Sequence, residues 1–383
     1  MGFGEDIRHR FMLDPELAFL NNGSFGAVPK EVMAAQDRIR REAEWEPVGF
    51  MRRTYDRGLR QALEPVAQFI GADAENGVFV ENATAGINAV LRSWAFTTGD
   101  AILTTTHTYG AVLQALRYVC QRTGATLIEV EVPFPIDGPE AIVAAVEAAW
   151  TDEVRMGVFD HISSATGLVY PIASLVALCK ERGVLSLVDG AHVPGHLSLD
   201  IRELGADFYV GNLHKWLFAP KGCGVLWVAP QHRSQVHPVV ISHGYGTGLH
   251  AEFDWVGTRD FSAWLSARAG VAFMEALGAE RVRSHNRQMR REGAALIREA
   301  WGTEAPAPEG MLGALATLDL PCRIPGDAES ALAVENALYE RHRIVVPVFP
   351  FGDRSWIRIS AQVFNTLGDY ERLARAVGPE GVR

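Results

Sequence analysis

Short apolar runs alternate with amphipathic stretches through the first two thirds of the chain. The runs are bounded by Gly, Asp or Pro and are apolar on both faces, which is typical of buried strands in a mostly parallel sheet. They predict strands at 78–80, 101–104, 126–130, 156–159, 184–188, 208–210 and 224–228. The amphipathic stretches predict the intervening helices, at 31–41, 86–94, 111–123, 139–150 and 172–182.

The pattern changes after about residue 260. A long helical stretch, 262–300, leads to a Pro-rich segment, and a strand at 314–318, a helix at 328–341 and an alternating strand at 356–360 follow. We therefore predict an α/β protein in three parts. A mostly parallel seven-stranded sheet sandwiched by helices occupies a large domain, 21–260; a smaller α+β domain covers 261–383; and the N-terminal segment 1–20 packs on the small domain.

Composition narrows the class of protein. The chain has 383 residues, of which 48% are hydrophobic, so it can bury a large core. Its formal charge of −10 gives no electrostatic support to a nucleic-acid partner. No apolar run reaches the roughly 18 residues that span a bilayer, and the acidic start lacks the order of a signal peptide, so we expect no membrane partner and a cytoplasmic location. The four cysteines are scattered without metal-type or disulfide-type spacing, and we predict no metal site.

Two strands of the predicted sheet end on residues that carry chemistry, and ligands gather at the carboxyl ends of parallel strands. The first strand ends on Asp189, with His192 in the following turn; such an Asp alone can simply accept from loop amides. The second runs into Lys215, which has aromatic and apolar neighbours, whereas Lys30, Lys180 and Lys221 look solvated. A lysine in an apolar pocket has a lowered pKa and can form a Schiff base, although it can also extend its ammonium to water.

A third point is the passage from the strand at 78–80 to the helix that follows. Small residues stand there, and the free amides of the helix start together with the Thr84 hydroxyl would bind a phosphate. Many helices are capped in the same way, so this signal is weak alone. A phosphate cradle, a strand-end carboxylate and a buried lysine are together what pyridoxal phosphate (PLP) requires.

Five motifs make the chain resemble a known family. They are Asn-Asn-Gly-Ser-Phe-Gly at 21–26, Asp-His-Ile-Ser-Ser at 160–164, Asp-Gly-Ala-His at 189–192, Gly-Asn-Leu-His-Lys-Trp at 211–216 and Gly-Thr-Arg-Asp at 257–260. The chain resembles fold-type I PLP enzymes of the class V aminotransferase group, which includes cysteine desulfurases, kynureninases and isopenicillin N epimerases. The resemblance runs from residue 19 to Arg358 and is strongest to the epimerase-like branch.

The resemblance implies roles for residues that match the motifs. Lys215 would be the Schiff-base lysine and would move the proton at Cα, and Asp189 would pair with the pyridine nitrogen. Further cofactor contacts are implied at Ala83, Thr84 and Asn212 or His214 for the phosphate, at His192 and Ser164 near the ring oxygen, and at Tyr109 for stacking on the ring. Thr258 matches a threonine that reaches the phosphate of the neighbouring subunit, which implies a homodimer with shared sites.

Substrate contacts are implied on three segments. Arg358 lies on the alternating strand where the family places the arginine that binds the α-carboxylate, although it could also be a surface arginine. Asn22 fits a second contact to that carboxylate, and Arg259 either binds a substrate side chain or does not touch the substrate. We expect segments 45–55 and 242–253 to build the rest of the pocket, and the aromatic and arginine content of 45–55 suggests an extended or acidic substrate.

Several reactions at Cα of an amino acid stay open. The segment 345–355 contains no cysteine, which argues against a cysteine desulfurase. An epimerase is favoured by resemblance and needs a second acid, for which Tyr109, Tyr245 or a water are candidates. The alternative is a C–S β-lyase acting on cysteine conjugates or sulfoxides, for which Lys215 suffices. An aminotransferase is third, and a non-catalytic protein is least supported because Lys215 and Asp189 are both present.

Overall fold

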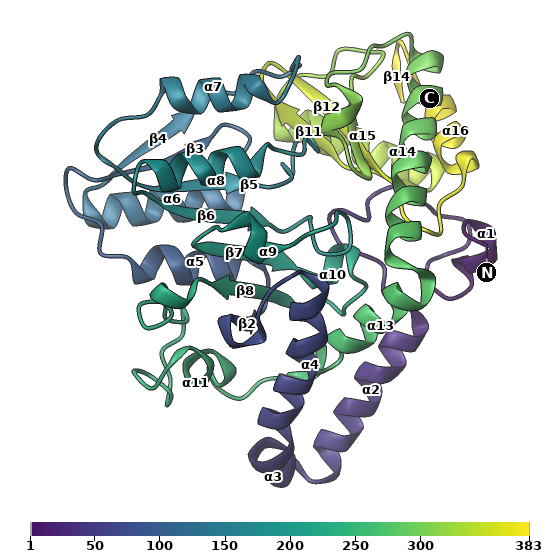
Figure 1. Cartoon of the computed structure of the whole chain (residues 1–383). Coiled ribbons are helices and arrows are strands. Elements are labelled where there is room, and N and C mark those ends of the chain that lie inside the picture. The colour runs from purple at the N-terminus through teal and green to yellow at the C-terminus, as the bar shows by residue number, and fades with distance from the viewer. Residues whose placement is uncertain (1, 383) are drawn as a thin grey trace.

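A seven-stranded sheet forms the centre of the computed structural model, which describes residues 2–382 (Figure 1). The strand order is β2-β8-β7-β6-β5-β3-β4, and β8 runs antiparallel to both of its neighbours while the other pairs are parallel. The predicted mostly parallel sheet is therefore confirmed. Its strands are β2 (Gly77–Val80), β3 (Ala101–Thr105), β4 (Thr126–Val130), β5 (Val154–Asp160), β6 (Leu185–Gly190), β7 (Phe208–Asn212) and β8 (Gly224–Val228).

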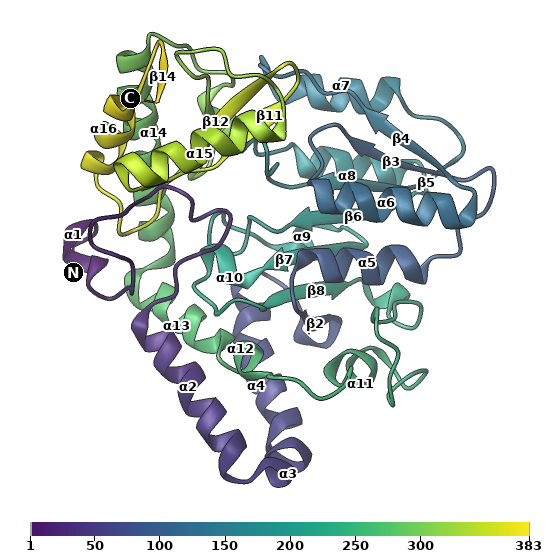
Figure 2. The same ribbon diagram turned by 180° about the vertical axis from the view of Figure 1, so that it is seen from behind.

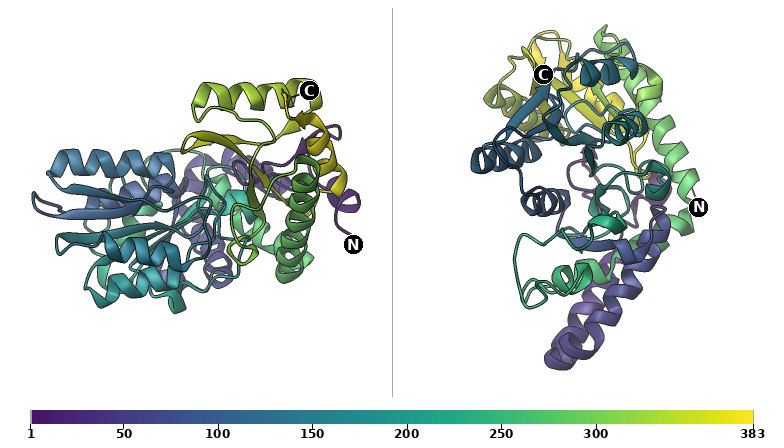
Figure 3. Two further views of the ribbon diagram at one scale, coloured as in Figure 1. Left: turned by 90° about the horizontal axis from the view of Figure 1, so that it is seen from above. Right: turned by 60° about the vertical axis from the view of Figure 1, so that its left-hand side comes forward.

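Helices cover both faces of this sheet (Figure 3, left). Successive residues of a strand point to opposite faces, so Phe208 packs with α5 and α6 on one side and Tyr209 with α4 and α8 on the other. Two apolar layers enclose the sheet, which explains why its inner strands are apolar on both faces, whereas the edge strand β4 exposes Thr126 and Glu129. The helices are α4 (Tyr55–Phe69), α5 (Ala83–Ser93), α6 (Gly110–Thr123), α7 (Glu140–Ala148), α8 (Ile172–Glu181) and α9 (Ile201–Leu204).

A second, three-stranded antiparallel sheet has the order β11-β12-β9 and is covered by α15 (Figure 2). The N-terminal segment joins this part of the molecule, because β1 (Ala18–Phe19) pairs in parallel with β10 (Ile344–Val345). The elements here are β9 (Leu315–Leu318), β11 (Val348–Phe351), β12 (Arg354–Ser360), β13 (Val377–Gly378), β14 (Gly381–Val382), α15 (Ala328–His342) and α16 (Leu367–Ala376). Among residues 2–382, no helix combines the length and apolar character needed to cross a membrane.

The expected single helix at 262–300 is divided into three. They are α12 (Ser262–Leu265), α13 (Ala267–Leu277) and α14 (Ala279–Trp301). Gly278 separates α13 from α14 with a φ of 82°, a conformation that glycine adopts without the clash that a Cβ atom causes. The break lets α14 leave the large sheet and run up to the three-stranded sheet (Figure 1).

Residues 45–55 do not form the expected pocket loop. They join α2 (Lys30–Trp45) to α4 through α3 (Pro47–Gly49) and a π-helical turn, Phe50–Thr54. This helical hairpin projects from the body of the molecule, and its tip lies far from the three-stranded sheet (Figures 1 and 3). Within one chain, the side chains of this segment therefore do not support the prediction of an extended or acidic substrate.

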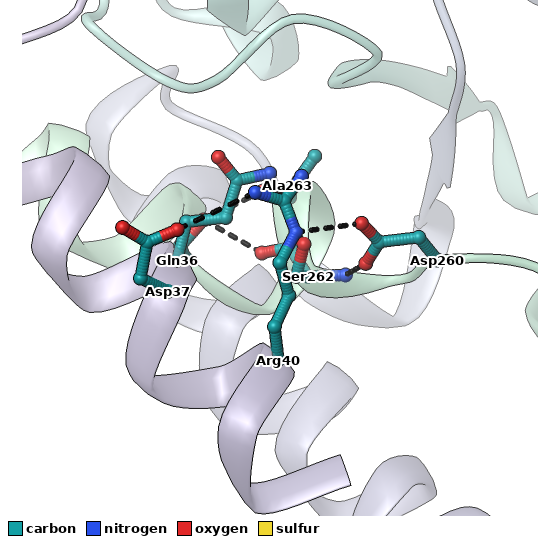
Figure 4. A network of polar contacts seen from close by, with 7 residues as sticks. Gln36, Asp37, Arg40, Asp260, Ser262 and Ala263 are labelled. Atoms are coloured by element: carbon teal, nitrogen blue, oxygen red, sulfur yellow. Dashed lines mark hydrogen bonds and ion pairs between the residues drawn. The ribbon is translucent and has the colours of Figure 1, made fainter. Parts of the chain in front are cut away.

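Polar contacts fix α2 to the start of α12 (Figure 4). Arg40 Nε donates to Asp260 Oδ2 at 2.8 Å, and Gln36 Nε2 donates to Ser262 Oγ at 3.1 Å. The Ser262 amide also donates to Asp260 Oδ1 at 2.8 Å. These contacts anchor one end of the segment 255–261, which joins α11 to α12. The remaining helices are α1 (Glu5–Arg8), α10 (Leu213–Trp216) and α11 (Leu249–Asp254).

Candidate active site

A cavity of about 450 Å³ opens where β5, β6 and β7 end. It lies between the large sheet and the three-stranded sheet, because Phe349 of β11 also lines it. Residues predicted from the sequence make up nearly half of its lining: Ala83, Thr84, Tyr109, Ser164, Asp189, His192, Asn212, His214 and Lys215. The parallel topology thus gathers residues that are up to 132 positions apart in the chain at one sheet edge.

Lys215 places a buried amine in this cavity. It belongs to the single-turn helix α10, which follows β7 directly. Burial, helped by the positive charge of Arg358, lowers the pKa of the Lys215 amine to about 8. Its Nζ lies 3.1 Å from His192 Nε2, and within residues 2–382 no carboxylate lies at ion-pair distance from it. A sizeable share of the amine is therefore neutral near pH 7–8, which is the form that condenses with an aldehyde.

Asp189 and Asp160 bring two carboxyl groups to the floor of the cavity. They end neighbouring strands, and their Cα atoms are paired in register. Burial raises the pKa of both groups, and the charge of Asp189 adds to the rise at Asp160. A cationic ring nitrogen beside Asp189 would relieve this cost of burial. Asp160 was missed as a site residue, although its place at the end of an apolar run is the same signal that indicated Asp189.

The first turn of α5 forms the end of the cavity that suits a phosphate. Asn212 Oδ1 accepts from the Ala83 amide at 2.8 Å, and Asn82 caps the helix by accepting from the Ala85 amide at 2.9 Å. Thr84, between these two amides, lines the cavity. Asn212 thus holds the cradle from behind. His214 is held by a contact of 2.7 Å between its Nδ1 and the Cys223 carbonyl, and burial lowers the pKa of the His214 imidazole to about 4.

Arg358 lies directly behind the cavity wall. Its guanidinium donates to the carbonyl and hydroxyl oxygens of Ser164 and, at 3.4 Å, to Ser24 Oγ, and it lies 4.8 Å from the centre of the Phe349 ring. All three of these neighbours line the cavity. Burial lowers the pKa of the Arg358 guanidinium to about 10, so it stays charged at neutral pH. Its Nε has no hydrogen-bond partner among the described residues, which leaves donor capacity for an anion.

Asn22 supports Lys215 from outside the cavity. Its side chain is fully buried, donates from Nδ2 to the Lys215 carbonyl at 3.0 Å and accepts from the Ala27 amide at 3.1 Å. Both ends of the amide group are therefore used within the protein. The geometry suits a role in positioning Lys215 better than the predicted contact with a substrate carboxylate.

Arg259 and Thr258 also lie outside the cavity. Arg259 forms a close ion pair with Glu81, whose side chain is part of the cavity wall, and lies 4.0 Å from the centre of the Trp264 ring. Because Glu81 meets its charge, Arg259 is a poor candidate for a substrate ligand. Thr258 is exposed on the segment between α11 and α12, and nothing within the chain brings it to the cavity.

Some lining residues were not predicted from the sequence. Lys221, expected to be solvated, lies at the mouth of the cavity, and its Nζ donates to the Gly26 carbonyl at 2.7 Å. Burial lowers the pKa of this amine. A partial signal existed, because the Pro-Lys-Gly turn follows so soon after Lys215 that it had to return near the same sheet edge. The other unpredicted lining residues are Gly23, Ser24, Phe25, Glu81, Asn82, Asp160, Ile162, Ala191, Gly222 and Phe349.

The segment 242–253 does not supply a wall of this cavity within the chain. Tyr245 is 60% exposed, packs against the His237 ring and does not line this cavity. Cys120, Cys179 and Cys223 are buried and Cys322 is partly buried, and none of the described cavity-lining residues is a cysteine.

Comparison with known proteins identifies the family. The family model described as Aminotransferase class-V matches residues 28–373. The chain belongs to the class-V aminotransferases. It is 35% identical to the putative L-cysteine desulfhydrase 1 of Oryza sativa subsp. japonica, covering 94% of this chain and 82% of that protein. It is 32% identical to the isopenicillin N epimerase of Streptomyces clavuligerus, covering 97% of each.

The solved structures agree with the fold. The class-V protein superimposes with a TM-score of 0.80 on a variant of C-DES, a cystine C–S lyase, that has glycine covalently linked to the PLP cofactor. The match covers 96% of this chain and 98% of C-DES at 21% identity. The fold is therefore that of fold-type I PLP enzymes. Its membership of the class-V family, together with its enzyme relatives, makes this protein a PLP-dependent enzyme.

The residues of the cavity fit PLP. Lys215 offers a buried amine of lowered pKa, Asp189 offers a buried carboxyl group for the ring nitrogen, and Thr84 in the first turn of α5 offers its amide and hydroxyl to the phosphate. Tyr109 is 46% exposed at the cavity, which leaves its ring face free to stack. His192 stands beside Lys215, where the family resemblance places a contact to the ring oxygen.

Proposed function

We propose that this class-V enzyme is a C–S β-lyase that acts on cysteine or a cysteine-derived amino acid. The observation that carries the proposal is that Lys215 brings a buried amine of lowered pKa to the cavity, with His192 Nε2 at 3.1 Å from its Nζ. Elimination needs a single group that moves protons, because the same amine removes the Cα proton and returns a proton to the leaving group.

The proposed reaction balances at each atom. The Lys215 amine takes the proton from Cα, the Cβ–S bond breaks, and its electron pair leaves with sulfur. The sulfur is protonated to hydrogen sulfide from cysteine, to a thiol from an S-alkyl cysteine, or to a sulfenic acid from a sulfoxide. The remaining three-carbon fragment reacts with water to give pyruvate and ammonia. When bound, PLP supplies the electron sink that makes the Cα proton acidic.

Other residues of the site would hold the reactants. Arg358 would bind the α-carboxylate through its guanidinium, which stays charged at neutral pH, and Asp189 would keep the ring nitrogen protonated. Ala83 and Thr84 would bind the phosphate at the start of α5, with Asn212 holding that turn in place. Asn22 would fix the backbone of Lys215 so that the amine stays aimed at Cα.

Similarity supports the same reaction class. The relatives include proteins named as cysteine desulfhydrases at 31–35% identity, and release of sulfur from cysteine is a β-elimination. The sequence alone favoured epimerisation, and the order of the two hypotheses is reversed here. The reason is that Tyr245, a candidate for the second acid, lies outside the cavity within one chain.

An isopenicillin N epimerase-like reaction is the second candidate. It is favoured by one observation, the position of Tyr109 in the cavity wall, where its hydroxyl could protonate Cα from the side opposite Lys215. Reprotonation on the opposite face inverts the configuration and leaves the side chain intact, so the products of the two reactions differ.

Proton NMR in D₂O separates the two reactions. Purified holoenzyme is incubated with L-cysteine, S-alkyl cysteines, a cysteine sulfoxide and L-amino acids that lack a β leaving group. The lyase produces pyruvate together with a thiol or sulfenic acid, and the Lys215→Ala variant produces neither. Loss of the Cα proton signal with the side chain intact, and with the opposite configuration appearing, would replace the lyase by the epimerase.

Tyr109→Phe is expected to distinguish the candidates independently. The substitution keeps the aromatic ring for stacking and removes the hydroxyl. β-Elimination should continue within about threefold of the wild-type kcat, whereas an epimerase that needs this acid should lose on the order of 10²-fold or more. Initial rates of pyruvate release, coupled to a dehydrogenase, measure the first quantity, and a loss of 100-fold would contradict the lyase assignment.

We also propose that the enzyme works as a cytoplasmic homodimer. The family resemblance gives Thr258 a role at the neighbouring subunit's phosphate, and Thr258 is exposed outside its own cavity. A run of exposed apolar residues, Val239, Val240 and Ile241, supports a covered surface, since monomers seldom expose such runs. Sedimentation of the holoenzyme at the mass of one chain would contradict the dimer.

A further inference from the structure

Three buried rings form a cluster behind Lys215. Trp216 is fully buried, and its Nε1 donates to His192 Nδ1 at 3.4 Å. The other nitrogen of that imidazole, Nε2, lies 3.1 Å from Lys215 Nζ. The Trp216 ring packs on His196 with 4.2 Å between ring centres. A continuous chain of contacts therefore runs from the indole through His192 to the amine.

The direction of the hydrogen bonds in this chain is determined by the indole. An indole N–H can only donate, so His192 Nδ1 must accept and cannot carry a proton. Burial, with the positive charges of Lys215 and Arg358, lowers the pKa of His192 well below its usual range, so the ring is neutral. A neutral imidazole with an unprotonated Nδ1 carries its proton on Nε2. His192 consequently points an N–H at Lys215 Nζ.

The neighbouring His196 holds His192 at its backbone. The Ala314 amide donates to His196 Nε2, so the proton of that ring lies on Nδ1, which donates to the His192 carbonyl at 3.0 Å. Burial lowers the pKa of His196 to about 3, so it too is neutral. The charged groups that act on the Lys215 amine are then Arg358, which disfavours its protonation, and the carboxyl groups of Asp189 and Asp160, which favour it.

We propose that Trp216 is a positioning residue that fixes His192 in the Nε2–H form, so that the imidazole always offers a donor to the nitrogen of Lys215. A donor stabilises the unprotonated form of that nitrogen and disfavours the protonated form. Without the indole, the ring can move its proton to Nδ1 and accept from Lys215, which has the opposite effect. The inference deepens the proposed function and rests on its assignment of Lys215.

The test is a pH titration of the visible absorption of the holoenzyme carrying Trp216→Phe. We expect the midpoint for the Lys215 nitrogen to move up by about one pH unit, a tenfold change in its protonation ratio. Trp301→Phe is the matched control, because Trp301 is also buried and donates from Nε1 to a carbonyl, that of Ala374 in the small domain. A Trp216→Phe midpoint equal to that of the wild type would overturn the proposal.

A double variant shows whether the effect passes through His192. Glutamine has no tautomers of this kind, so Trp216→Phe should shift the midpoint little in a His192→Gln background. An equal shift in both backgrounds would mean that the indole acts on Lys215 by some other route, and would overturn the proposal.

A direct measurement covers the case in which Trp216→Phe does not fold. ¹⁵N NMR of wild-type holoenzyme labelled at histidine should show an unprotonated Nδ1 and a protonated Nε2 for His192, assigned by its loss in His192→Gln. A protonated Nδ1 would overturn the proposal. The tautomer of His192 is measured independently of the reaction that the enzyme catalyses. The absence of pyruvate in the D₂O experiment would count against the lyase alone. A failure of this inference can therefore be distinguished from a failure of the proposed function.

Discussion

Burial lowers the pKa of both cations of the site, Lys215 and Arg358, but with different consequences. It lowers the pKa of Lys215 to about 8, so this amine can lose its proton near neutral pH. It lowers the pKa of Arg358 to about 10, which leaves the guanidinium charged. The intrinsic pKa of arginine is much higher than that of lysine, so the same physical effect produces a base from one residue and an anchor from the other.

Arg358→Lys is expected to weaken substrate binding more than turnover. Lysine keeps the positive charge but loses the planar fork that binds a carboxylate with two hydrogen bonds. We expect KM for amino-acid substrates to rise by about tenfold with a smaller change in kcat, measured by steady-state kinetics. Arg354→Lys, on the same strand and paired with Asp319 at the surface, is the control. An unchanged KM in Arg358→Lys would remove Arg358 from the substrate site.

Strand-end residues of the site could be predicted from the sequence pattern, whereas some contacts made by loop residues could not. Asp189 and Lys215 follow apolar runs, and parallel strands bring such ends together. Lys221 depends on a partner far away in the chain, the Gly26 carbonyl, and no local pattern predicts that contact. Asn22 was predicted as a site residue, but its contact with the Lys215 carbonyl was not. Arg259 and Thr258 do not line the cavity of their own chain, so the structure of one chain does not bring them to their implied roles.

At the scale of elements, the docking of α5 on the sheet determines where the phosphate cradle lies. Gly86 allows this close approach, because a Cβ atom there would lie 2.5 Å from Val210 Cγ1 of β7. Val210 is fully buried in the strand and cannot move aside cheaply. The position of the first turn, with Ala83 and Thr84, thus depends on a glycine one turn further on.

Gly86→Ala is therefore expected to weaken PLP binding. Displacing α5 by even part of the overlap costs on the order of 1–3 kcal/mol, about tenfold or more in cofactor affinity when the cradle moves with it. Absorbance titration of the cofactor measures the loss, and adding Val210→Ala should restore part of it by removing the clashing methyl group. Gly310→Ala, where a Cβ meets nothing within 4 Å, is the control. Equal affinity in Gly86→Ala and the control would contradict the role of this packing.

The predicted helices and strands agree with the structure where one hydrophobic period continues along the whole element. They disagree where a single residue interrupts an element without changing that period. The seven apolar runs all became strands of one sheet, since their pattern reflects burial on both faces. The stretch 262–300 kept its helical period across Gly278, so the break was not apparent, although the glycine itself was a signal. The π-helical turn Phe50–Thr54 has no comparable signature in the sequence.

At the scale of the whole molecule, the site lies where the large sheet meets the three-stranded sheet. The large sheet supplies the proposed cofactor residues, and β11 and β12 of the three-stranded sheet supply Phe349 and Arg358. The helix α14 and the β1–β10 pair connect the two parts of the molecule. The buried histidines of this folded arrangement make its stability depend on pH.

Stability is expected to fall on acidification from about pH 6.5 toward pH 4. Burial lowers the pKa of His107, His161 and His214 to about 4 in the folded protein. A histidine in the unfolded chain has a pKa near 6.5. The unfolded chain therefore binds more protons in this window, and each histidine costs up to roughly 1.4 kcal/mol of unfolding free energy per pH unit. The stabilisation is fully present above pH 6.5. Thermal unfolding across pH 4–8 measures the fall.

His161→Gln tests the contribution of one such group. Glutamine does not titrate, so the decrease in Tm below pH 6.5 should be shallower than in the wild type, while His9→Gln at the exposed surface should leave the slope unchanged. A Tm that is independent of pH in the wild type between 6.5 and 4 would contradict the neutral, buried state of these histidines.

The central claim is that Lys215 carries the cofactor, and borohydride reduction tests it most directly. The chain has four lysines, so reduction of the holoenzyme followed by proteolysis and mass spectrometry has four possible outcomes for the site of attachment. The account predicts a pyridoxyl phosphate mass on the peptide that contains Lys215, and none on those with Lys30, Lys180 or Lys221. Attachment at Lys221, the other lysine at the cavity, or no fixed cofactor at all would contradict it.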